Sequence, residues 1–225
     1  MLIIKNNPKY LAIAILIGGK STRFGSDKGL YNFLGKPLIT HQLETLKQGN
    51  YNIFIVASSK EQVQNYVNKI DIRNITAFIV DDNSIISDLQ IHTPSKGIYS
   101  ALKELKELGY EKTLTLACDN PLIQFNVIEF LIEQSKGYDC CIPQWDNGFL
   151  EPLLTIYPNK KTLKKLTENL RINDLRMTNI IEKCWKINYL SIENSIRPLD
   201  KKLLTFLNIN TPNDIKNLKQ IYKNN

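Results

Sequence analysis

Short apolar runs alternate along this chain with longer segments in which apolar residues recur every three or four positions. The short runs, rich in Ile, Val, Leu and Phe, predict β-strands. We expect them at residues 11–17, 52–58, 75–80, 113–118, 138–143, 152–157, 184–189 and 203–208. Strands that alternate with helical segments are typical of a mostly parallel sheet covered by helices on both faces. The pattern therefore predicts a three-layer α/β sandwich.

The longer segments carry local helix signals. Pro37 suits a first helical position, and a glycine follows the last periodic residue, so a helix is predicted over 37–48 with His41 on one of its faces. A second helix is predicted over 95–108, where apolar residues recur at spacings of three and four. The capping residue Thr211 marks the start of a last helix.

Length and charge restrict the class of protein. The chain has 225 residues and no Pro/Gly/Ser-rich linker, so we expect a single domain over 1–225. Its formal net charge is +7, but the lysines are scattered, and those at 160–165 and 216–223 suit exposed helix faces. We therefore expect no nucleic-acid partner. A positive net charge also suits a pocket for phosphorylated ligands.

The four cysteines and two histidines do not indicate a zinc site. No pair of cysteines has the C-x-x-C spacing, and Cys118, Cys140 and Cys141 fall in apolar runs typical of core residues in a reducing compartment. No apolar segment is long enough to span a membrane, and residues 1–10 lack the apolar core of a signal peptide. We expect a cytoplasmic protein without a membrane partner.

A glycine-rich segment directly after the first predicted strand is the strongest functional signal. Its glycines allow a tight turn that exposes backbone N–H groups to an anion, and its cationic side chains add donors for phosphate. These residues are Gly18, Gly19, Gly25, Lys20, Arg23 and Lys28. The spacing matches neither the P-loop nor the dinucleotide-binding G-x-G-x-x-G pattern. The segment predicts a nucleotide site of another kind.

This segment resembles the signature L-x-G-G-x-S-x-R-M/F-G-x-D-K of nucleotidyltransferases of the molybdenum cofactor guanylyltransferase type. The matching residues are Leu16, Gly18, Gly19, Ser21, Arg23, Phe24, Gly25, Asp27 and Lys28. The resemblance implies a Rossmann-like fold of the nucleotidyltransferase type. It also implies that Leu16, Ile17, Gly18 and Gly19 wrap the nucleotide and that Arg23 and Lys28 neutralise its triphosphate.

A second signal lies at the end of the strand predicted at 113–118. Asp119 follows this apolar run, and Pro121 turns the chain away. Ligands of open α/β sheets collect at such strand ends. A carboxylate there suits Mg²⁺, which binds one or two carboxylates together with substrate phosphates. Cys-Asp-Asn-Pro also resembles the family's C-D-x-P segment, which implies that Asp119 binds the metal and the nucleotide.

Two further segments resemble nucleotide-contacting parts of the family. The pair Asp81-Asp82 follows a predicted strand where the family has an acid that touches the nucleotide, and Asp82 is the better register. A solvated loop role for both acids is an equal alternative. Gly97 carries over from the family's G-P-L-A-G-[IL] segment, in which a glycine approaches the base and ribose.

The acceptor side is indicated near the C-terminus. Residues 206–212 resemble the family's F-x-N-[IV]-N-T-P, and Asn208 and Asn210 alternate onto one face of an extended segment, where both amides could meet one ligand. Glu151 belongs to a segment that resembles E-P-L-x-x-x-Y. Arg171 and Arg176 lie where the family tends to place arginines near the pterin phosphate, but solvated helix arginines are the default interpretation.

The resemblance implies transfer of GMP from GTP to the terminal phosphate of molybdopterin, with Mg²⁺ as cofactor and pyrophosphate as product. It allows Mo-cofactor insertion or acceptor proteins as partners. At the end of the second strand the family often has an asparagine near the base, whereas this chain reads Ala57-Ser58-Ser59. A cytidylyltransferase on the same pterin, or a transferase acting on a phosphorylated sugar or alcohol, is therefore the alternative. A nucleotide-binding regulatory module is the alternative from another class.

Overall fold

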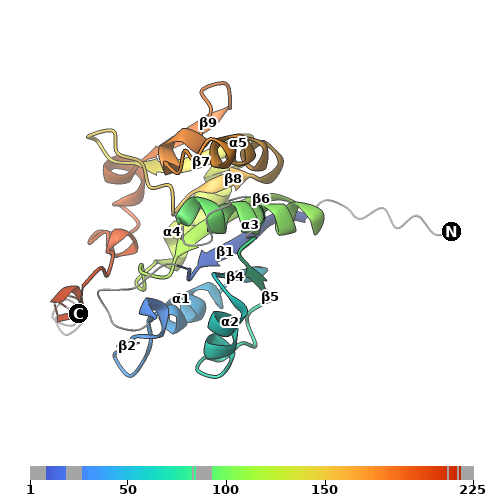
Figure 1. Ribbon diagram of the computed structural model, residues 1–225. Helices are drawn as coiled ribbons and strands as arrows, with labels where there is room; N and C mark the ends of the chain where they lie inside the picture. The colour runs from blue at the N-terminus through green and yellow to red at the C-terminus, as the bar shows by residue number, and fades with distance from the viewer. Residues whose placement is uncertain are drawn as a thin grey trace.

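A seven-stranded sheet forms the centre of the computed structural model, which describes residues 9–18, 27–82, 84, 93–211, 213–216 and 218. The strand order is β5-β4-β1-β6-β8-β7-β9 (Figure 1). The strands are β1 (Lys9–Leu16), β4 (Ile53–Ala57), β5 (Ala77–Val80), β6 (Tyr110–Ala117), β7 (Cys140–Gln144), β8 (Ile156–Pro158) and β9 (Ile187–Ser191). β8 is antiparallel to both of its neighbours, and the other neighbouring pairs are parallel.

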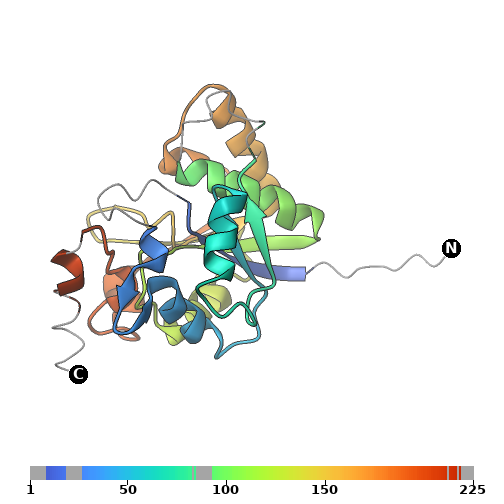
Figure 2. The ribbon, with the colours of Figure 1, turned by 60° about the horizontal axis from the view of Figure 1, so that its bottom comes forward.

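Helices cover both faces of this sheet. Figure 2 shows α3 and α5 on one side of it and α1 and α4 on the other. The α-helices are α1 (Leu38–Leu46), α2 (Lys60–Val67), α3 (Pro94–Glu107), α4 (Phe125–Gln134) and α5 (Asn159–Arg171). Short elements complete the fold: 3₁₀ turns at Lys28–Leu30, Met177–Ile180 and Leu204–Phe206, a π-turn at Ile192–Ile196, and a hairpin of β2 (Asn32–Phe33) and β3 (Lys36–Pro37).

Alternating side chains of the central strands build two core layers. Ile13 and Ile15 of β1 pack in one cluster with residues of α1 and α4, whereas Ala14 and Leu16 pack in the other with residues of α3 and α5. Because both faces of the strand are buried, its sequence is a continuous apolar run rather than an alternating one. The predicted α/β sandwich, with a mostly parallel sheet between two helical layers, is confirmed.

The order of the strands determines where a ligand can bind. Chain order runs outward through β4 and β5 on one side of β1, and then returns to β6 on the other side. Such a reversal is a topological switch point, and the carboxyl ends of the two central strands open a crevice there. In this protein the crevice lies between the end of β1 at Leu16 and the end of β6 at Ala117.

One predicted strand is wrong. Residues 203–208 form a 3₁₀ turn at Leu204–Phe206 instead, and Leu203 before it adopts a left-handed conformation with φ of 50°. The buried carboxylate of Asp200 accepts hydrogen bonds from the backbone N–H groups of Leu204 and Thr205, at 3.0 and 2.8 Å. The Asp200 carboxylate therefore caps a turn, and these N–H groups do not pair with a neighbouring strand. Of the strand predicted at 152–157, residues 152–154 form a turn, and β8 begins only at Ile156. The other predicted strands are confirmed, with ends that differ by up to three residues.

The local helix signals are also confirmed. The predicted helices at 37–48 and 95–108 correspond to α1 and α3, and His41 lies on α1 with its Nε2 2.8 Å from the carbonyl oxygen of Phe33. Residues 213–216 are helical, and Thr211 and Asp214 cap each other's backbone N–H groups, at 3.3 and 2.7 Å.

The predicted core cysteines, Cys118, Cys140 and Cys141, are buried, and Cys184 is exposed. No helix in the described part of the chain is both long and apolar enough for a membrane span.

Candidate active site

Three separate segments meet at the switch point. Asp119 follows β6, Lys28 begins the 3₁₀ turn after the glycine-rich segment, and Asn210 lies in the extended stretch before the last helix. The ammonium Nζ of Lys28 donates to Oδ2 of Asp119 at 3.1 Å and to Oδ1 of Asn210 at 3.0 Å. The structure thus brings together residues that are 182 positions apart in sequence. Lys28 and Asp119, which were each predicted as site residues from the sequence, are therefore in direct contact.

The segment that carries Asn210 is held against the end of β6. The backbone N–H of Ile209 donates to the carbonyl oxygen of Asp119 at 2.9 Å, and the Ile209 side chain is fully buried. Since side chains alternate along an extended segment, Asn208 and Asn210 point to the other face and are exposed. This arrangement agrees with the expectation that both amides share a face.

Asp27 determines the position of Lys28 beside it. Oδ1 of Asp27 accepts from the backbone N–H of Gly29 at 3.1 Å and from the hydroxyl of Tyr66 at 2.5 Å, and Oδ2 accepts from Gln62 at 2.5 Å. Gly29 has no room for a side chain, because an added Cβ would lie 2.2 Å from the Tyr66 hydroxyl oxygen. The turn that presents Lys28 is therefore fixed on α2.

Gln62 is a structural residue that our sequence reasoning missed. Its Nε2 donates to the carbonyl oxygen of Ile17 at 3.0 Å as well as to Asp27, and its Oε1 accepts from the backbone N–H of Ser58 at 2.8 Å. It therefore ties together the ends of β1 and β4 and the turn that carries Lys28. The sequence signal was the Ser59-x-x-Gln62 spacing of a helix start, and Ser59 does cap the N–H of Gln62.

A narrow pocket lies on the β4 and β5 side of the switch point. Its lining residues are Leu16, Gly18, Val56, Asp81, Thr93, Pro94 and Gly97. A Cβ added to Gly18 would lie 3.9 Å from Oδ2 of Asp81, and one added to Gly97 would lie 3.7 Å from Oδ1. Both glycines therefore leave bare backbone beside one carboxylate. Of the predicted nucleotide residues, Leu16, Gly18 and Gly97 meet in this pocket.

The two neighbouring acids have opposite surroundings. Burial raises the pKa of Asp81 to about 6, and the charge of Lys96, itself 1% exposed, opposes this change. Asp82 points away and accepts from Lys103 at 2.7 Å and from Ser84, which lower its pKa to about 2. This geometry favours Asp81 as the acid that faces a nucleotide, whereas the sequence analysis favoured Asp82. The two acids differ because successive side chains leave an extended segment in opposite directions.

Pro94 is another residue that sequence reasoning passed over. It is the first residue of α3 and lies three residues before Gly97. Together with Thr93 it lines the pocket. Proline is well suited to a first helical position, and this signal could have extended the site to the helix start. Gly19 and Arg23 lie outside the described residues.

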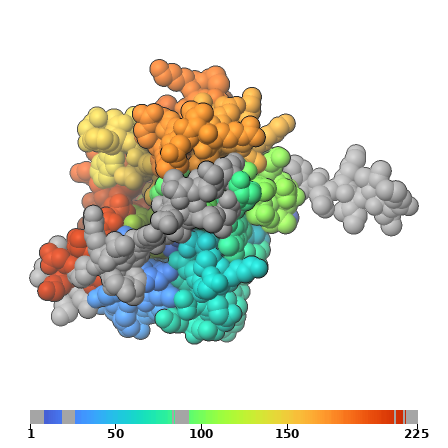
Figure 3. Space-filling model, viewed as in Figure 1, coloured from blue at the N-terminus to red at the C-terminus, as the bar shows by residue number. Residues whose placement is uncertain are grey.

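A second cavity, of about 130 Å³, lies on the β8 side of Asp119. It is lined by Asp119, Asn120, Glu151, Pro152, Leu153, Leu154, Phe206 and Asn208. The two cavities therefore lie on opposite sides of the switch point, one at the ends of β1 and β4 and the other beyond the end of β6. In Figure 3 the blue to cyan segments and the yellow to orange segments likewise occupy opposite ends of the molecule.

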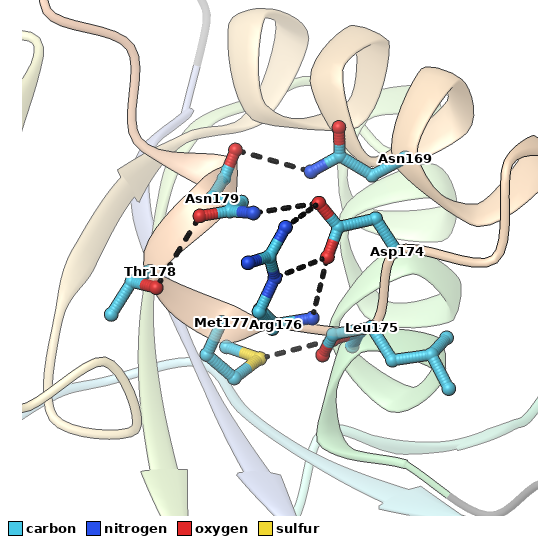
Figure 4. A network of polar contacts seen from close by, with 8 residues as sticks. Asn169, Asp174, Leu175, Arg176, Met177, Thr178 and Asn179 are labelled. Carbon is cyan, nitrogen blue, oxygen red and sulfur yellow. Dashed lines mark hydrogen bonds and ion pairs between the residues drawn. The ribbon is translucent and has the colours of Figure 1, made fainter.

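The two candidate arginines do not border either cavity. Arg171 is the exposed last residue of α5. Arg176 is held by Asp174 through two hydrogen bonds of 3.0 and 3.1 Å, and Asn179 donates to the same carboxylate at 2.6 Å (Figure 4). These donors lower the pKa of Asp174. In this structure Arg176 organises the loop after α5.

Comparisons with known proteins show the family of this chain. The family model described as MobA-like NTP transferase domain matches residues 13–184. A probable molybdenum cofactor guanylyltransferase from Pyrococcus horikoshii is 32% identical, over 91% of this chain and 97% of that protein. Its counterpart from Thermococcus gammatolerans is 31% identical with the same coverage.

Solved structures give the same result. The crystal structure of molybdopterin-guanine dinucleotide biosynthesis protein A from Archaeoglobus fulgidus has a TM-score of 0.76 and 25% identity, and the match covers 95% of this chain and 100% of that one. The 4-diphosphocytidyl-2C-methyl-D-erythritol synthase from Anaerococcus prevotii has a TM-score of 0.65 at 12% identity, with 96% of each chain covered, and shares the fold alone. From the family match and the switch-point site together, we conclude that this chain belongs to the MobA-like NTP transferase family and is a nucleotidyltransferase.

Proposed function

We propose that this protein transfers GMP from GTP to the terminal phosphate of molybdopterin and releases pyrophosphate. The observation that carries the proposal is the position of Lys28, held by Asp119 and Asn210 at the switch point, with one cavity on each side of that point. The names of the relatives, which mention molybdenum cofactor guanylyltransferase, support this choice of substrates.

We assign the nucleotide to the pocket of Gly18, Asp81 and Gly97. Bare backbone at the two glycines allows a ring and sugar to approach closely. Guanine presents two adjacent N–H donors along one edge, which match the two oxygens of a carboxylate such as Asp81. Cytosine presents one donor beside an acceptor, which a carboxylate would repel. This chemistry favours GTP over CTP.

The reaction requires alignment and charge neutralisation. An oxygen of the acceptor phosphate attacks the α-phosphorus of GTP, a new P–O bond forms, and the bond to the β-phosphate oxygen breaks to release pyrophosphate. The attacking phosphate oxygen is already an anion, so no protein base is needed. We expect Lys28, held by its contact with Asp119 and by the turn that Asp27 fixes, to stabilise negative charge that develops on the transferred group.

Asp119 is the residue that would hold Mg²⁺. Its carboxylate lies just after the end of β6 and lines the second cavity, and Mg²⁺ binds one or two carboxylates together with substrate phosphate oxygens. The described residues contain no group of three or more His, Cys, Asp or Glu side chains arranged for a metal. Substrate phosphates and water are the other ligands that Mg²⁺ usually takes. When bound, the ion would neutralise phosphate charge. Arg23 as a second cation, the cytoplasmic location and protein partners stay predictions.

The test is pyrophosphate release with molybdopterin and Mg²⁺, with GTP, CTP, ATP and UTP compared at equal concentration. We expect turnover with GTP alone. A preference for CTP would assign the protein to cytidylyl transfer, and no release with any of the four would refute the proposal.

Lys28→Met should lose this activity. Lys103→Met is the matched control, because Lys103 also pairs with an aspartate, at 2.7 Å, but lines neither cavity. Equal loss in both variants would contradict the role of Lys28.

A further inference from the structure

Glu151 is a half-buried carboxylate on the wall of the second cavity to which the proposed reaction assigns no task. It lies in the turn before β8 and shares the cavity with Asp119, Asn208 and Phe206. Burial raises its pKa. A carboxylate placed partly out of water is costly for the folded protein unless it is hydrogen-bonded, so its presence beside the reaction centre needs an explanation.

The Glu151 side chain is held in one position. Its backbone N–H donates to the carbonyl oxygen of Pro143 at 3.0 Å, and its Oε1 accepts from the indole N–H of Trp145 at 2.7 Å. Trp145 in turn packs edge-on against Phe206, with ring centroids 5.4 Å apart. The carboxylate is thus fixed at the edge of a cavity that also has an aromatic wall.

Phe206 is fixed from the other side of the cavity. It closes the 3₁₀ turn that Asp200 caps, and the side-chain amide of Asn120 donates to the carbonyl oxygen of Thr205 at 3.2 Å. The cavity walls are therefore tied both to the end of β6 and to the segment that carries Asn208. A site built from fixed walls is suited to a rigid, planar ligand.

We propose that Glu151 recognises the pterin ring of the acceptor by accepting hydrogen bonds from its N3–H and its 2-amino group. This inference rests on the proposed function, which makes a pterin the acceptor, and adds a residue that selects it.

The chemistry of both partners supports this assignment. The N3–H and 2-amino groups of a pterin are adjacent donors that point the same way, like the fork of a guanidinium group, and carboxylates bind such forks with two parallel hydrogen bonds. Each carboxylate oxygen has two lone pairs, so Oε1 of Glu151 can keep the Trp145 contact and accept a second donor. Partial burial strengthens these hydrogen bonds.

The size and place of the cavity agree with one ring of a pterin. Its volume is about 130 Å³, and a cavity of roughly 150 Å³ is known to bind benzene. The cavity therefore suits the pyrimidine ring, with the rest of the acceptor outside it. Asp119 lines the same cavity, so the acceptor phosphate can lie near the reaction centre while the ring edge contacts Glu151.

The experiment uses a pair of probes that differ at the recognised edge. We would titrate the protein with 6-hydroxymethylpterin and with 6-hydroxymethyllumazine, which has an oxygen in place of the 2-amino group, and follow the fluorescence of the probe. The wild-type protein should bind the pterin about tenfold more tightly or better, the effect of about 1.4 kcal/mol expected from one charge-assisted hydrogen bond. Glu151→Gln, which keeps the shape of the side chain, should lose this preference.

A matched control separates recognition from structure. Glu182 also accepts from an indole N–H, that of Trp185 at 3.0 Å, but does not line the cavity. Glu182→Gln should bind both probes like the wild type. In the transfer assay, Glu151→Gln should raise the KM for molybdopterin about tenfold or more and leave the KM for GTP and the Mg²⁺ requirement unchanged.

The outcomes distinguish this inference from the proposed function. If the wild type transfers GMP but Glu151→Gln keeps the pterin preference and the acceptor KM, the role of Glu151 is refuted alone. A changed Mg²⁺ requirement with unchanged pterin binding would also refute it, because Glu151 would then act on the metal. If the pterin preference depends on Glu151 but no GMP is transferred to molybdopterin, the proposed function fails and the pterin site stands.

Discussion

Asp81→Asn should stabilise the protein while it weakens nucleotide binding. Burial raises the pKa of Asp81 from 3.8 to about 6, so at neutral pH the folded state holds an ionised carboxylate that would be better hydrated in the unfolded chain. One pKa unit corresponds to about 1.4 kcal/mol, which gives an upper limit of about 3 kcal/mol for this cost. An amide carries no charge and avoids it. Residual hydration of the pocket reduces the expected gain to about 1–2 kcal/mol.

The free-energy cost of burying the Asp81 carboxylate depends on pH. Because the folded-state pKa is the higher one, the cost is fully present above pH 6, shrinks as the pH falls from 6 to 3.8, and vanishes below 3.8, where Asp81 becomes protonated in both states. Urea unfolding followed by circular dichroism would compare the variant with the wild type at pH 8 and at pH 4.5. We expect the larger difference at pH 8 and about 1 kcal/mol or less at pH 4.5. An equal difference at both pH values, or a less stable variant at pH 8, would refute the reasoning.

The neighbouring residue provides a control of opposite sign. Lys103 and Ser84 lower the pKa of Asp82 to about 2, so its ionised form stabilises the folded state at all pH values above about 4. Asp82→Asn should therefore destabilise the protein, by less than about 1 kcal/mol because water screens this pair. In nucleotide titrations only the Asp81 variant should lose affinity. If only the Asp82 variant loses nucleotide affinity, Asp82 is the acid that contacts the nucleotide, as predicted from the sequence.

Three further variants test the site. Asp119→Asn should lower the rate of pyrophosphate release about 10²-fold or more with an unchanged circular dichroism spectrum, and wild-type activity would exclude a role in catalysis. Gly29→Ala should lower the free energy of unfolding by about 1–3 kcal/mol, because the new Cβ would lie 2.2 Å from the Tyr66 hydroxyl oxygen, and an unchanged urea midpoint would contradict this. Gly97→Ala places a Cβ 3.1 Å from Leu16 and should raise the KM for GTP but not for molybdopterin, so equal KM values for GTP would show that the nucleotide lies elsewhere.

The sequence signals that succeeded are local ones. The apolar runs predicted strands because a strand buried on both faces has no polar alternation, as in β1. Thr211 and Asp214 lie three residues apart and cap each other with little help from the rest of the chain. Spacing within one segment was sufficient in these cases, because the interacting groups are close in sequence.

The sequence by itself thus determined the α/β layers, the helix ends and the residues that follow β1 and β6. Only the tertiary structure decided that Lys28 contacts Asp119 and Asn210, that Asp81 faces the pocket, and that residues 204–206 form a turn capped by Asp200. These arrangements depend on groups as many as 182 positions apart. Propensity and periodicity act over a few residues, whereas the strand order brings distant segments to one end of the sheet. For this reason the switch point, and not any single motif, defines the site.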